Sequence, residues 1–396
     1  MHTLATPADR LNASYDRDIS VNGQFSIQMI TDVQAVERLK TEWDRLAAVQ
    51  ISYRPFLCFD WFKIWFEHFL RSNNLLILLL YKNEQLVTIA PFIIREEKSK
   101  GVKTKRIELA GNVYSPIRYF ILSPYNDAPA CISTILEFFK SEYTQWDIID
   151  FPSIPEENSA FDMLLHEIAK TGFQYIDYFC FWNMYLDEID YPGEEYLRRR
   201  PGNISKNVPY RMRRLQRLGE LEIKLITNSD NLDHDMDIYY ELYSRSWQKE
   251  EHVGPTFHRS FVRMAAENGW LRLGYLFFKG LPIACQFWIS ADRYAYIVKL
   301  FYDEQYQHHA PGKILSAEMA KWIIDRDKVS VIDYLHGDES YKKDWTPLKR
   351  GRKGITVYNR NSKGQYMALL NKKILPVLNK YPLLKEAKEM IAKKLR

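Results

Sequence analysis

The chain has 396 residues, of which 46% are hydrophobic, 14% aromatic and 27% charged. This length and composition favour a globular protein with two cores, and they exclude a disordered or fibrous chain. A formal net charge of +5 is too small for this length to indicate a nucleic-acid-binding protein by itself. The longest apolar run, residues 75–81, is far too short to cross a bilayer, so we expect a cytoplasmic protein.

The cysteine and histidine spacing argues against a metal site. No C-x-x-C pair is found among the four cysteines, which are Cys58, Cys131, Cys180 and Cys285. Neither a zinc site nor a disulfide framework is suggested by that spacing. The adjacent His308 and His309 would point in different directions on any helix or strand. We therefore expect buried thiols and no bound metal.

The first half of the chain alternates between strand-like and helix-like patterns. Residues 1–23 are polar and are expected to be loosely ordered. A short strand precedes Asp32, a good N-cap for a helix with apolar residues at helical spacing. An aromatic helix at 59–70 is followed by two strands, 75–81 and 86–94, that form a hairpin. Further strands are predicted at 106–109, 119–122, 147–151 and 175–184, and further helices at 130–141 and 159–170.

A second hairpin, at residues 271–289, repeats the strand, basic turn and strand order of the first. Its Gln286-Phe287 pair aligns with Pro91-Phe92, and helical segments precede both hairpins. We therefore expect a duplicated α/β domain. The segment Tyr191-Pro192-Gly193 separates the copies, and a basic helix at 208–218 is expected at their junction.

A strand, a helix and a second strand are predicted at 294–301, 314–324 and 329–335. Strands joined in this way usually lie parallel in one sheet. Ligands bind at the carboxyl ends of such strands, so we expect chemistry in the loops 302–313 and 336–345.

This stretch carries motifs of a known family. They are K-L-x-Y-D-x-x-Y from Lys299 to Tyr306, the Pro311-Gly312 pair, the strand end Ile332-Asp333, and G-D-E-x-Y-K from Gly337 to Lys342. Together they resemble the CelD/BcsL-like acetyltransferases of the GNAT superfamily, a group similar in turn to the FemABX aminoacyltransferases.

The resemblance implies a mixed α/β fold with two tandem GNAT-like acyl-CoA N-acyltransferase domains. The expected domains are a degenerate one at 24–190 and a catalytic one at 191–358, and a basic helical tail at 359–396 follows them. In such enzymes the diphosphate of acyl-CoA rests on backbone amides at a helix start. The resemblance assigns that place to Ala310, Pro311, Gly312 and Lys313.

The same resemblance implies that the thioester lies between residues 296–300 and 331–335. We assign removal of the amine proton to Asp338, protonation of the thiolate to Tyr341 and stabilisation of the oxyanion to Lys342. The residues assigned to substrate binding are Lys299, Tyr302, Trp247 and His336.

Each assignment has a structural alternative. The Pro311-Gly312 turn can simply enter a helix, and Asp338 can cap one. Tyr341 and Trp345 are spaced i, i+4 and can pack together in the core, whereas Lys342 can be a surface lysine.

The leading interpretation is an N-acyltransferase that uses acetyl-CoA or another acyl-CoA. Its expected acceptor is an amino sugar or similar intermediate of exopolysaccharide or cell-envelope synthesis. One alternative is a FemABX-like transferase whose donor is aminoacyl-tRNA, with the basic segment 198–217 as the track for that donor. The other is an inactive accessory subunit of a polysaccharide synthase. No DNA partner is expected, and we favour docking of the amphipathic tail after Asn371 on the protein over peripheral membrane contact.

Overall fold

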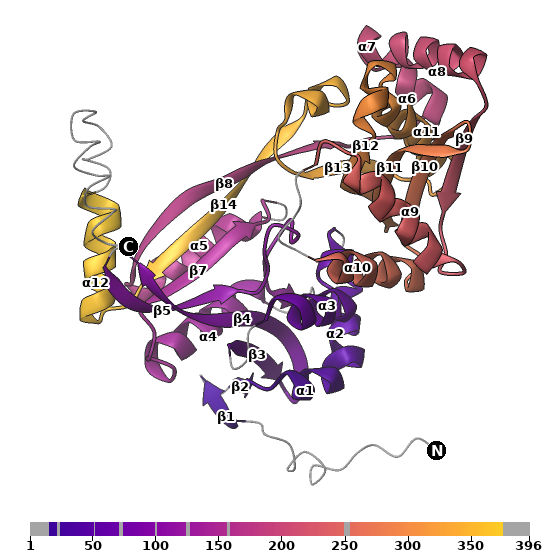
Figure 1. Cartoon of the computed structure of the whole chain (residues 1–396). Helices are drawn as coiled ribbons and strands as arrows, with labels where there is room; N and C mark the ends of the chain where they lie inside the picture. The colour runs from indigo at the N-terminus through magenta and orange to yellow at the C-terminus, as the bar shows by residue number, and fades with distance from the viewer. Residues whose placement is uncertain are drawn as a thin grey trace, which may run out of the picture.

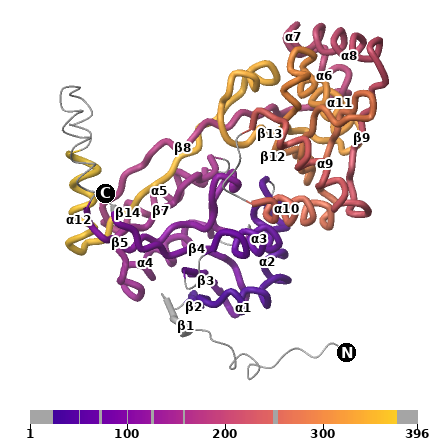
Figure 2. The backbone as a smooth tube through the Cα atoms, viewed as in Figure 1, coloured from indigo at the N-terminus to yellow at the C-terminus, as the bar shows by residue number. Residues whose placement is uncertain are grey.

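The computed structural model describes residues 16–21, 24–50, 52–70, 74–99, 101–123, 127–156, 159–248 and 254–374. The chain forms two α/β lobes, and two long strands, β8 (Gln174–Leu186) and β14 (Lys349–Tyr358), run between them (Figure 1). In Figure 2 the backbone passes from the first lobe along β8 to the second lobe and returns along β14. The predicted tail helices lie outside the described residues beyond Ile374.

The first lobe contains the elements before β8. In chain order they are β1 (Asp16–Val21), β2 (Phe25–Ile30), α1 (Val33–Val36), η2 (Glu37–Leu39), α2 (Lys40–Ala47), η3 (Arg54–Phe56), α3 (Phe59–Phe69), β3 (Leu75–Lys82), β4 (Gln85–Ser99), β5 (Val102–Leu109), β6 (Ile121–Leu122), α4 (Ala128–Ser141), β7 (Ile148–Ile154) and α5 (Ala160–Thr171). Asp32 caps α1 as predicted, because its side chain accepts a hydrogen bond from the Gln34 N–H. Strand β1 lies within the segment that we expected to be loosely ordered.

The second lobe contains the elements between β8 and β14. They are α6 (Gly193–Arg198), α7 (Gly202–Ser205), α8 (Asn207–Leu218), β9 (Leu221–Ile226), α9 (Leu232–Ser244), α10 (Pro255–Glu267), β10 (Leu271–Phe278), β11 (Leu281–Ala291), β12 (Tyr294–Tyr302), η5 (Glu304–His309), α11 (Pro311–Arg326), β13 (Val331–His336) and η6 (Ser340–Asp344). After β14 the chain continues into α12 (Ser362–Leu369) and η7 (Leu370–Ile374).

One mixed sheet runs through both lobes. Its strand order is β1-β2-β3-β4-β5-β7-β14-β8-β13-β12-β11-β10-β9, and β6 pairs with β4 off this path. The apolar run of β3 is buried on both faces, because alternate side chains enter two different cores. The predicted parallel pair of the second lobe is confirmed, since β12 and β13 are parallel neighbours.

The two lobes exchange their last strands. In the first lobe β5 pairs in parallel with β7, and the next strand along is β14 from the end of the chain. In the second lobe β12 pairs in parallel with β13, and the next strand along is β8 from the first half. The predicted boundary near residue 190 therefore divides the chain but not the sheet.

The two predicted hairpins occupy equivalent places in the sheet. Counted from the turns, the register pair Leu78 and Ala90 corresponds to the pair Gly274 and Gln286. The duplication is thereby supported, but our alignment of Gln286 with Pro91 was wrong by one residue. The bulge that each hairpin carries near its turn keeps the two registers in step.

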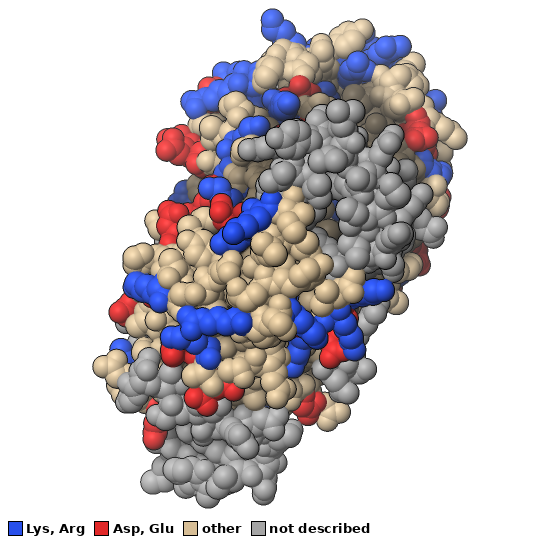
Figure 3. All heavy atoms as spheres, turned by 90° about the vertical axis from the view of Figure 1, so that its left-hand side faces the viewer, with Lys and Arg blue, Asp and Glu red and all other residues tan. Residues whose placement is uncertain are grey.

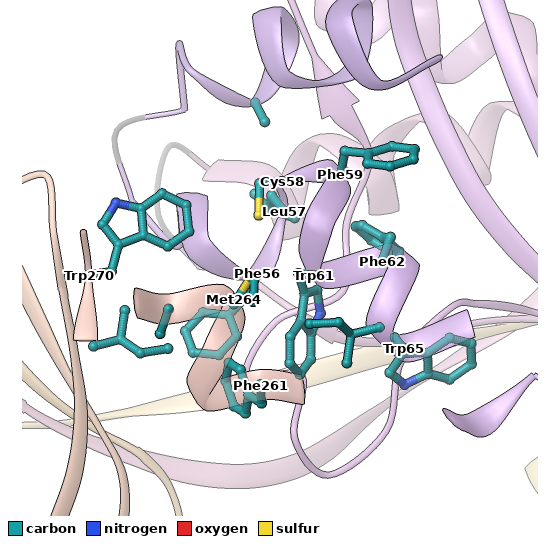
Figure 4. Packing of buried hydrophobic residues seen from close by; sticks show 14 of the residues in the cluster. Phe56, Leu57, Cys58, Phe59, Trp61, Phe62, Trp65, Phe261, Met264 and Trp270 are labelled. Atoms are coloured by element: carbon teal, nitrogen blue, oxygen red, sulfur yellow. The ribbon is translucent and has the colours of Figure 1, made fainter. Parts of the chain in front are cut away.

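An aromatic core holds the lobes together. In Figure 4, Trp61 and Phe56 of the first lobe face Phe261 and Met264 of α10. The ring centroids of Trp61 and Phe261 are 4.8 Å apart, and both side chains are buried. Burying aromatic side chains of this size dominates the energetics of an interface, so the lobes form one packed unit.

The basic helix predicted at 208–218 is observed as α8, but its predicted place at the lobe junction is wrong. It packs on α7, α11 and η5 at the outer end of the second lobe (Figure 1). The reason is its apolar stripe, in which Val208 and Leu215 are buried in the core of that lobe.

Candidate functional site

A gap opens between two parallel strands of the second lobe. Hydrogen-bonded pairing of β12 with β13 covers only Tyr294–Tyr296 and Val331–Asp333. The rest of β12, residues 297–302, continues beyond this short ladder, so its backbone groups on that side lack a strand partner within the described residues. Gln248 contacts this edge, since its Nε2 donates to the Leu300 carbonyl at 3.2 Å.

A pocket of about 260 Å³ lies at the open end of this gap. It is lined by Trp247, Leu300, Tyr302, Gln307, Ala310, Gly312, Lys313, Ser316, Tyr341 and Trp345. The walls come from β12, from the start of α11 and from η6. The start of α11 comes after β12 and η6 comes after β13, so the pocket lies at the carboxyl ends of the two strands, as predicted. The predicted site residues Trp247, Tyr302, Ala310, Gly312, Lys313 and Tyr341 are thus brought together.

The start of α11 is shaped for close approach to β12. Ala310 has a φ of 54°, in the left-handed region, and Pro311 occupies the first turn, where a missing N–H costs nothing. A Cβ at Gly312 would lie 3.2 Å from Cδ1 of Tyr302, so glycine allows the helix to meet the tyrosine ring. Pro311 itself is buried in this turn and does not line the pocket.

Fewer backbone donors face the pocket than we predicted. The N–H groups of Lys313 and Ile314 both donate to the Ala310 carbonyl, at 3.1 and 3.2 Å. Pro311 has no N–H, so Gly312 holds the one amide of this turn that donates to no carbonyl in the described part of the chain. Anion binding here would depend on side chains as well as on the helix start.

Tyr341 and Lys313 are the ionisable groups on the pocket wall nearest η6. Burial, and then the charge of Glu339, raise the pKa of Tyr341, so its hydroxyl stays protonated and can donate. The Lys313 ammonium lies 2.8 Å from the carboxylate of Asp344. This ion pair connects the start of α11 to η6.

Arg200, to which we assigned no individual role, anchors the same loop. Its guanidinium donates to the Trp345 carbonyl, and the Trp345 ring stacks on Tyr196 of α6 at a centroid distance of 6.5 Å. Trp345 is buried, so it packs in the core and also closes the pocket. The predicted packing of Trp345 in the core is therefore observed, and its place at the pocket was not predicted.

Lys342 does not face the pocket, and this part of our prediction was wrong. Its side chain is only 4% exposed. The ammonium donates to the carbonyls of Tyr334, His336 and Gly337 at 3.0, 2.6 and 3.3 Å, and it lies 2.8 Å from the Glu339 carboxylate. All of its donors are thus used in holding the turn after β13.

Asp338 and His336 also lie away from the pocket lining. The carboxylate of Asp338 is 3.7 Å from the Lys349 ammonium, and η6 is capped by neither Asp338 nor any other side chain. The His336 ring packs on Phe181 of β8 with centroids 4.0 Å apart. The predicted convergence of Asp338, Tyr341 and Lys342 therefore fails, because the left-handed turn at Gly337, with φ 98°, sends this chain past the pocket.

Lys299 lies on the other face of β12. Its neighbours Leu300 and Tyr302 line the pocket, whereas its ammonium lies 3.4 Å from Oε1 of Gln248 and 5.4 Å from the ring centre of Tyr243. Burial lowers the pKa of Lys299 to about 8, so a neutral amine is accessible near physiological pH. Of the predicted substrate-binding residues, Tyr302 and Trp247 are at the pocket and Lys299 faces the α9 side.

A buried polar network closes the base of the gap. The Asp333 carboxylate, which is 0% exposed, accepts hydrogen bonds from Tyr53, Asn183 and Arg350 at 2.7, 2.7 and 2.6 Å. These three partners come from the first lobe, from β8 and from β14 respectively. An aspartate within an apolar strand was the available sequence signal, but its partners are too distant in the chain to be found from sequence.

At the equivalent place in the first lobe, the chain of that lobe itself covers the strand edge. Asp150 of β7 occupies the place of Asp333, and it accepts from Thr356 of β14 at 2.8 Å. Further along β7, the Ser153 carbonyl accepts from the N–H of Arg118, at 3.1 Å. The chain of the first lobe thus lies against its own strand edge, and we place the candidate site in the second lobe.

Two kinds of feature are absent from the described residues. No group of three or more histidine, cysteine, aspartate or glutamate side chains with metal-binding geometry is found in the described ranges. In those ranges, too, every helix is too short or too polar to span a bilayer.

Comparison with known proteins finds a family match in the second lobe and structural similarity over most of the chain. Residues 202–343 match the family model described as an acetyltransferase (GNAT) domain. The structure is similar to that of FemX, with a TM-score of 0.56 and 9% identity over 81% of this chain and 96% of that chain. It is also similar to the C-terminal domain of a putative lysylphosphatidylglycerol synthetase from Agrobacterium fabrum, with a TM-score of 0.51 and 10% identity over 86% of this chain and 96% of that chain.

These likenesses confirm the predicted fold class, a mixed α/β protein with two tandem GNAT-like folds. At such low identity they show the fold alone. A search of curated proteins found no match. The narrower resemblance to the CelD/BcsL-like group remains a prediction.

Proposed function

We propose that this protein is an N-acyltransferase that moves an acetyl or other acyl group from acyl-CoA to an amine. The observation that carries the proposal is the pocket at the open end of the β12–β13 gap, inside the region that matches a GNAT domain. The free edge of β12 offers backbone groups to an extended donor arm, and the start of α11 offers the Gly312 N–H and the Lys313 ammonium to a diphosphate.

The side chains around the gap support a division of roles. Tyr341, which stays protonated, is placed to give its proton to the departing thiolate. Lys299, on the opposite face of β12, takes over the role that we had given to Asp338, because its neutral amine can accept the proton that the neutral acceptor amine loses as it attacks. The new carbon–nitrogen bond forms as the carbon–sulfur bond breaks, and the two protons move from nitrogen to Lys299 and from Tyr341 to sulfur.

For the acceptor we propose an amino sugar or a related intermediate of exopolysaccharide or cell-envelope synthesis. This narrower proposal rests on the motif resemblance and on Trp247, an aromatic side chain that is 47% exposed at the pocket. Exposed aromatic rings of this kind pack well against apolar faces of a ligand.

A second candidate, an aminoacyl-tRNA-dependent transferase, is favoured by the surface beside the pocket. Helix α8 carries Arg211, Arg213, Arg214 and Arg217, and none of these forms an ion pair with a described acidic residue. Arg211 donates to the His308 carbonyl of η5, which leads into the pocket wall. Lys and Arg side chains are frequent at the upper end of Figure 3, the height at which Figure 1 places α7 and α8. A basic surface of this kind attracts polyanions.

The test compares donors directly. We expect release of free thiol from acetyl-CoA with one or more amino sugars, and a Tyr341→Phe variant with kcat reduced by roughly 10²-fold at unchanged CoA affinity. Tyr210→Phe, at a tyrosine that is 58% exposed on α8, is the matched control and should leave the rate unchanged.

Binding measurements separate the alternatives. Absence of CoA binding together with salt-sensitive tRNA binding would establish the second candidate, and binding of neither donor would indicate an accessory subunit.

A further inference from the structure

Gln286 of β11 is a completely buried polar side chain, with 0% exposure, directly behind the start of α11. Its Nε2 donates to the Gly312 carbonyl at 2.9 Å and to Ser316 Oγ at 2.7 Å. Its Oε1 accepts from the indole N–H of Trp288 at 2.8 Å. Turning the amide over would set oxygen against the Gly312 carbonyl and NH₂ against the indole N–H, so these partners determine its orientation.

The orientation of Gln286 decides what Ser316 can do. Because Ser316 Oγ already accepts from Gln286, its hydroxyl proton has to be donated elsewhere. The Gly312 carbonyl, one helical turn back, is engaged by Gln286 and by the helix itself. Within the described residues the Ser316 hydroxyl has no protein acceptor, and Ser316 lines the pocket. The proton is therefore directed toward whatever fills the pocket.

The position of Ser316 indicates which part of a ligand it would meet. It lies one turn into α11 from Gly312, on the wall shared with Leu300 of β12. A diphosphate at the helix start would contact Gly312 and Lys313, so the group beside Ser316 is the arm that continues along β12. Backbone hydrogen-bond donors are scarce on this wall, because in the described structure the Gly312 N–H is the single amide of the first turn that donates to no carbonyl.

The first lobe lacks this arrangement. The residue that corresponds to Gln286 is Ala90, which is buried in an apolar core. A buried glutamine is costly unless all of its polar atoms are bonded, so its presence in one copy and not the other points to a role at the pocket.

We propose that Ser316, positioned by Gln286, donates a hydrogen bond to a carbonyl oxygen of the pantetheine arm of the donor, and so favours a phosphopantetheine thioester over a donor without that arm. This inference rests on the proposed acyl-CoA function. Gln286 is a positioning residue, because it acts through Ser316 and does not line the pocket.

Calorimetric titration of the full chain with CoA and with ADP tests the proposal, because ADP carries the diphosphate without the arm. Loss of one hydrogen bond predicts that Ser316→Ala weakens CoA binding about 3- to 10-fold while ADP binding stays the same. Ser316→Thr keeps the hydroxyl and should retain most of the CoA affinity. Gln286→Leu should weaken CoA binding to a similar extent, and adding Ser316→Ala to it should cause little further loss.

Two outcomes would overturn the proposal: Ser316→Ala that binds CoA as well as the wild-type chain, or Ser316→Ala that loses ADP affinity by the same factor. If Gln286→Leu fails to fold, the serine variants alone decide. If the wild-type protein binds neither CoA nor ADP, the proposed function itself is overturned. If the wild-type protein binds CoA and Ser316→Ala binds it equally well, only the role of Ser316 is overturned.

Discussion

Replacing Lys342 by methionine separates a structural lysine from a catalytic one. The ammonium donates to three backbone carbonyls, of Tyr334, His336 and Gly337, and the side chain is 4% exposed. Hydrogen bonds to a charged group contribute about 1.5–3 kcal/mol each, and the pair with Glu339, which is 55% exposed, adds less than about 1 kcal/mol. The methionine stem still fills the site, so we expect a net loss of about 3–5 kcal/mol in the free energy of unfolding, as for removal of one buried charged partner.

Urea unfolding followed by circular dichroism measures this loss. Lys343→Met is the matched control, because Lys343 is the next residue and is exposed; its effect should stay within about 0.5 kcal/mol. A Lys342→Met protein that unfolds at the wild-type urea concentration, yet turns over roughly 10²- to 10³-fold more slowly, would refute the structural assignment and restore the oxyanion role.

Three further predictions concern the gap and its base. Asp333→Asn should lower the free energy of unfolding by about 3–5 kcal/mol, whereas Asp338→Asn at the surface should cost less than about 1 kcal/mol; equal losses in chemical denaturation would contradict the buried network. Because burial lowers the pKa of Lys299 to about 8, its amine is neutral above that pH, so kcat should rise through about pH 8. Lys299→Met should remove this rise in a pH–rate profile, and a profile that keeps it would exclude Lys299 as the base. Gly312→Ala should weaken CoA binding by roughly 10-fold in calorimetry, because the new Cβ lies 3.2 Å from the Tyr302 ring, while Gly202→Ala, whose Cβ would meet Lys206 Cδ at an ordinary contact distance of 3.9 Å, should not.

Local patterns in the sequence were sufficient for most of the elements near the site. The apolar spacing of residues 314–324 and the β-branched and aromatic run at 294–301 predicted α11 and β12. Their order predicted a parallel pair, because a helical crossover brings two strands together in one sheet. The Pro311-Gly312 pair marked the helix start, and the repeated hairpin pattern indicated the duplication.

Side-chain direction in the loop after β13 could not be predicted in the same way. Leu335 and Gly337 both have positive φ, at 53° and 98°, and this turn points the carbonyls inward at Lys342. The motif placed Asp338, Tyr341 and Lys342 close in sequence, but only Tyr341 reaches the pocket. A one-dimensional motif carries residue types and spacing, whereas backbone dihedral angles decide which of them share a cavity.

The exchange of β8 and β14 was decided by tertiary structure alone. The local pattern of neither strand selects a lobe, since β8 alternates only in part between exposed and half-buried residues and most residues of β14 are buried. The choice depends on partners far apart in the chain: Asn183 reaches Asp333, and Thr356 reaches Asp150. The sequence by itself therefore predicted most of the strands and helices, because those preferences are local, although β9 and β14 were not predicted from it. Which strand completes which lobe, and which side chains face the gap, follow from long-range hydrogen bonds that no local pattern encodes.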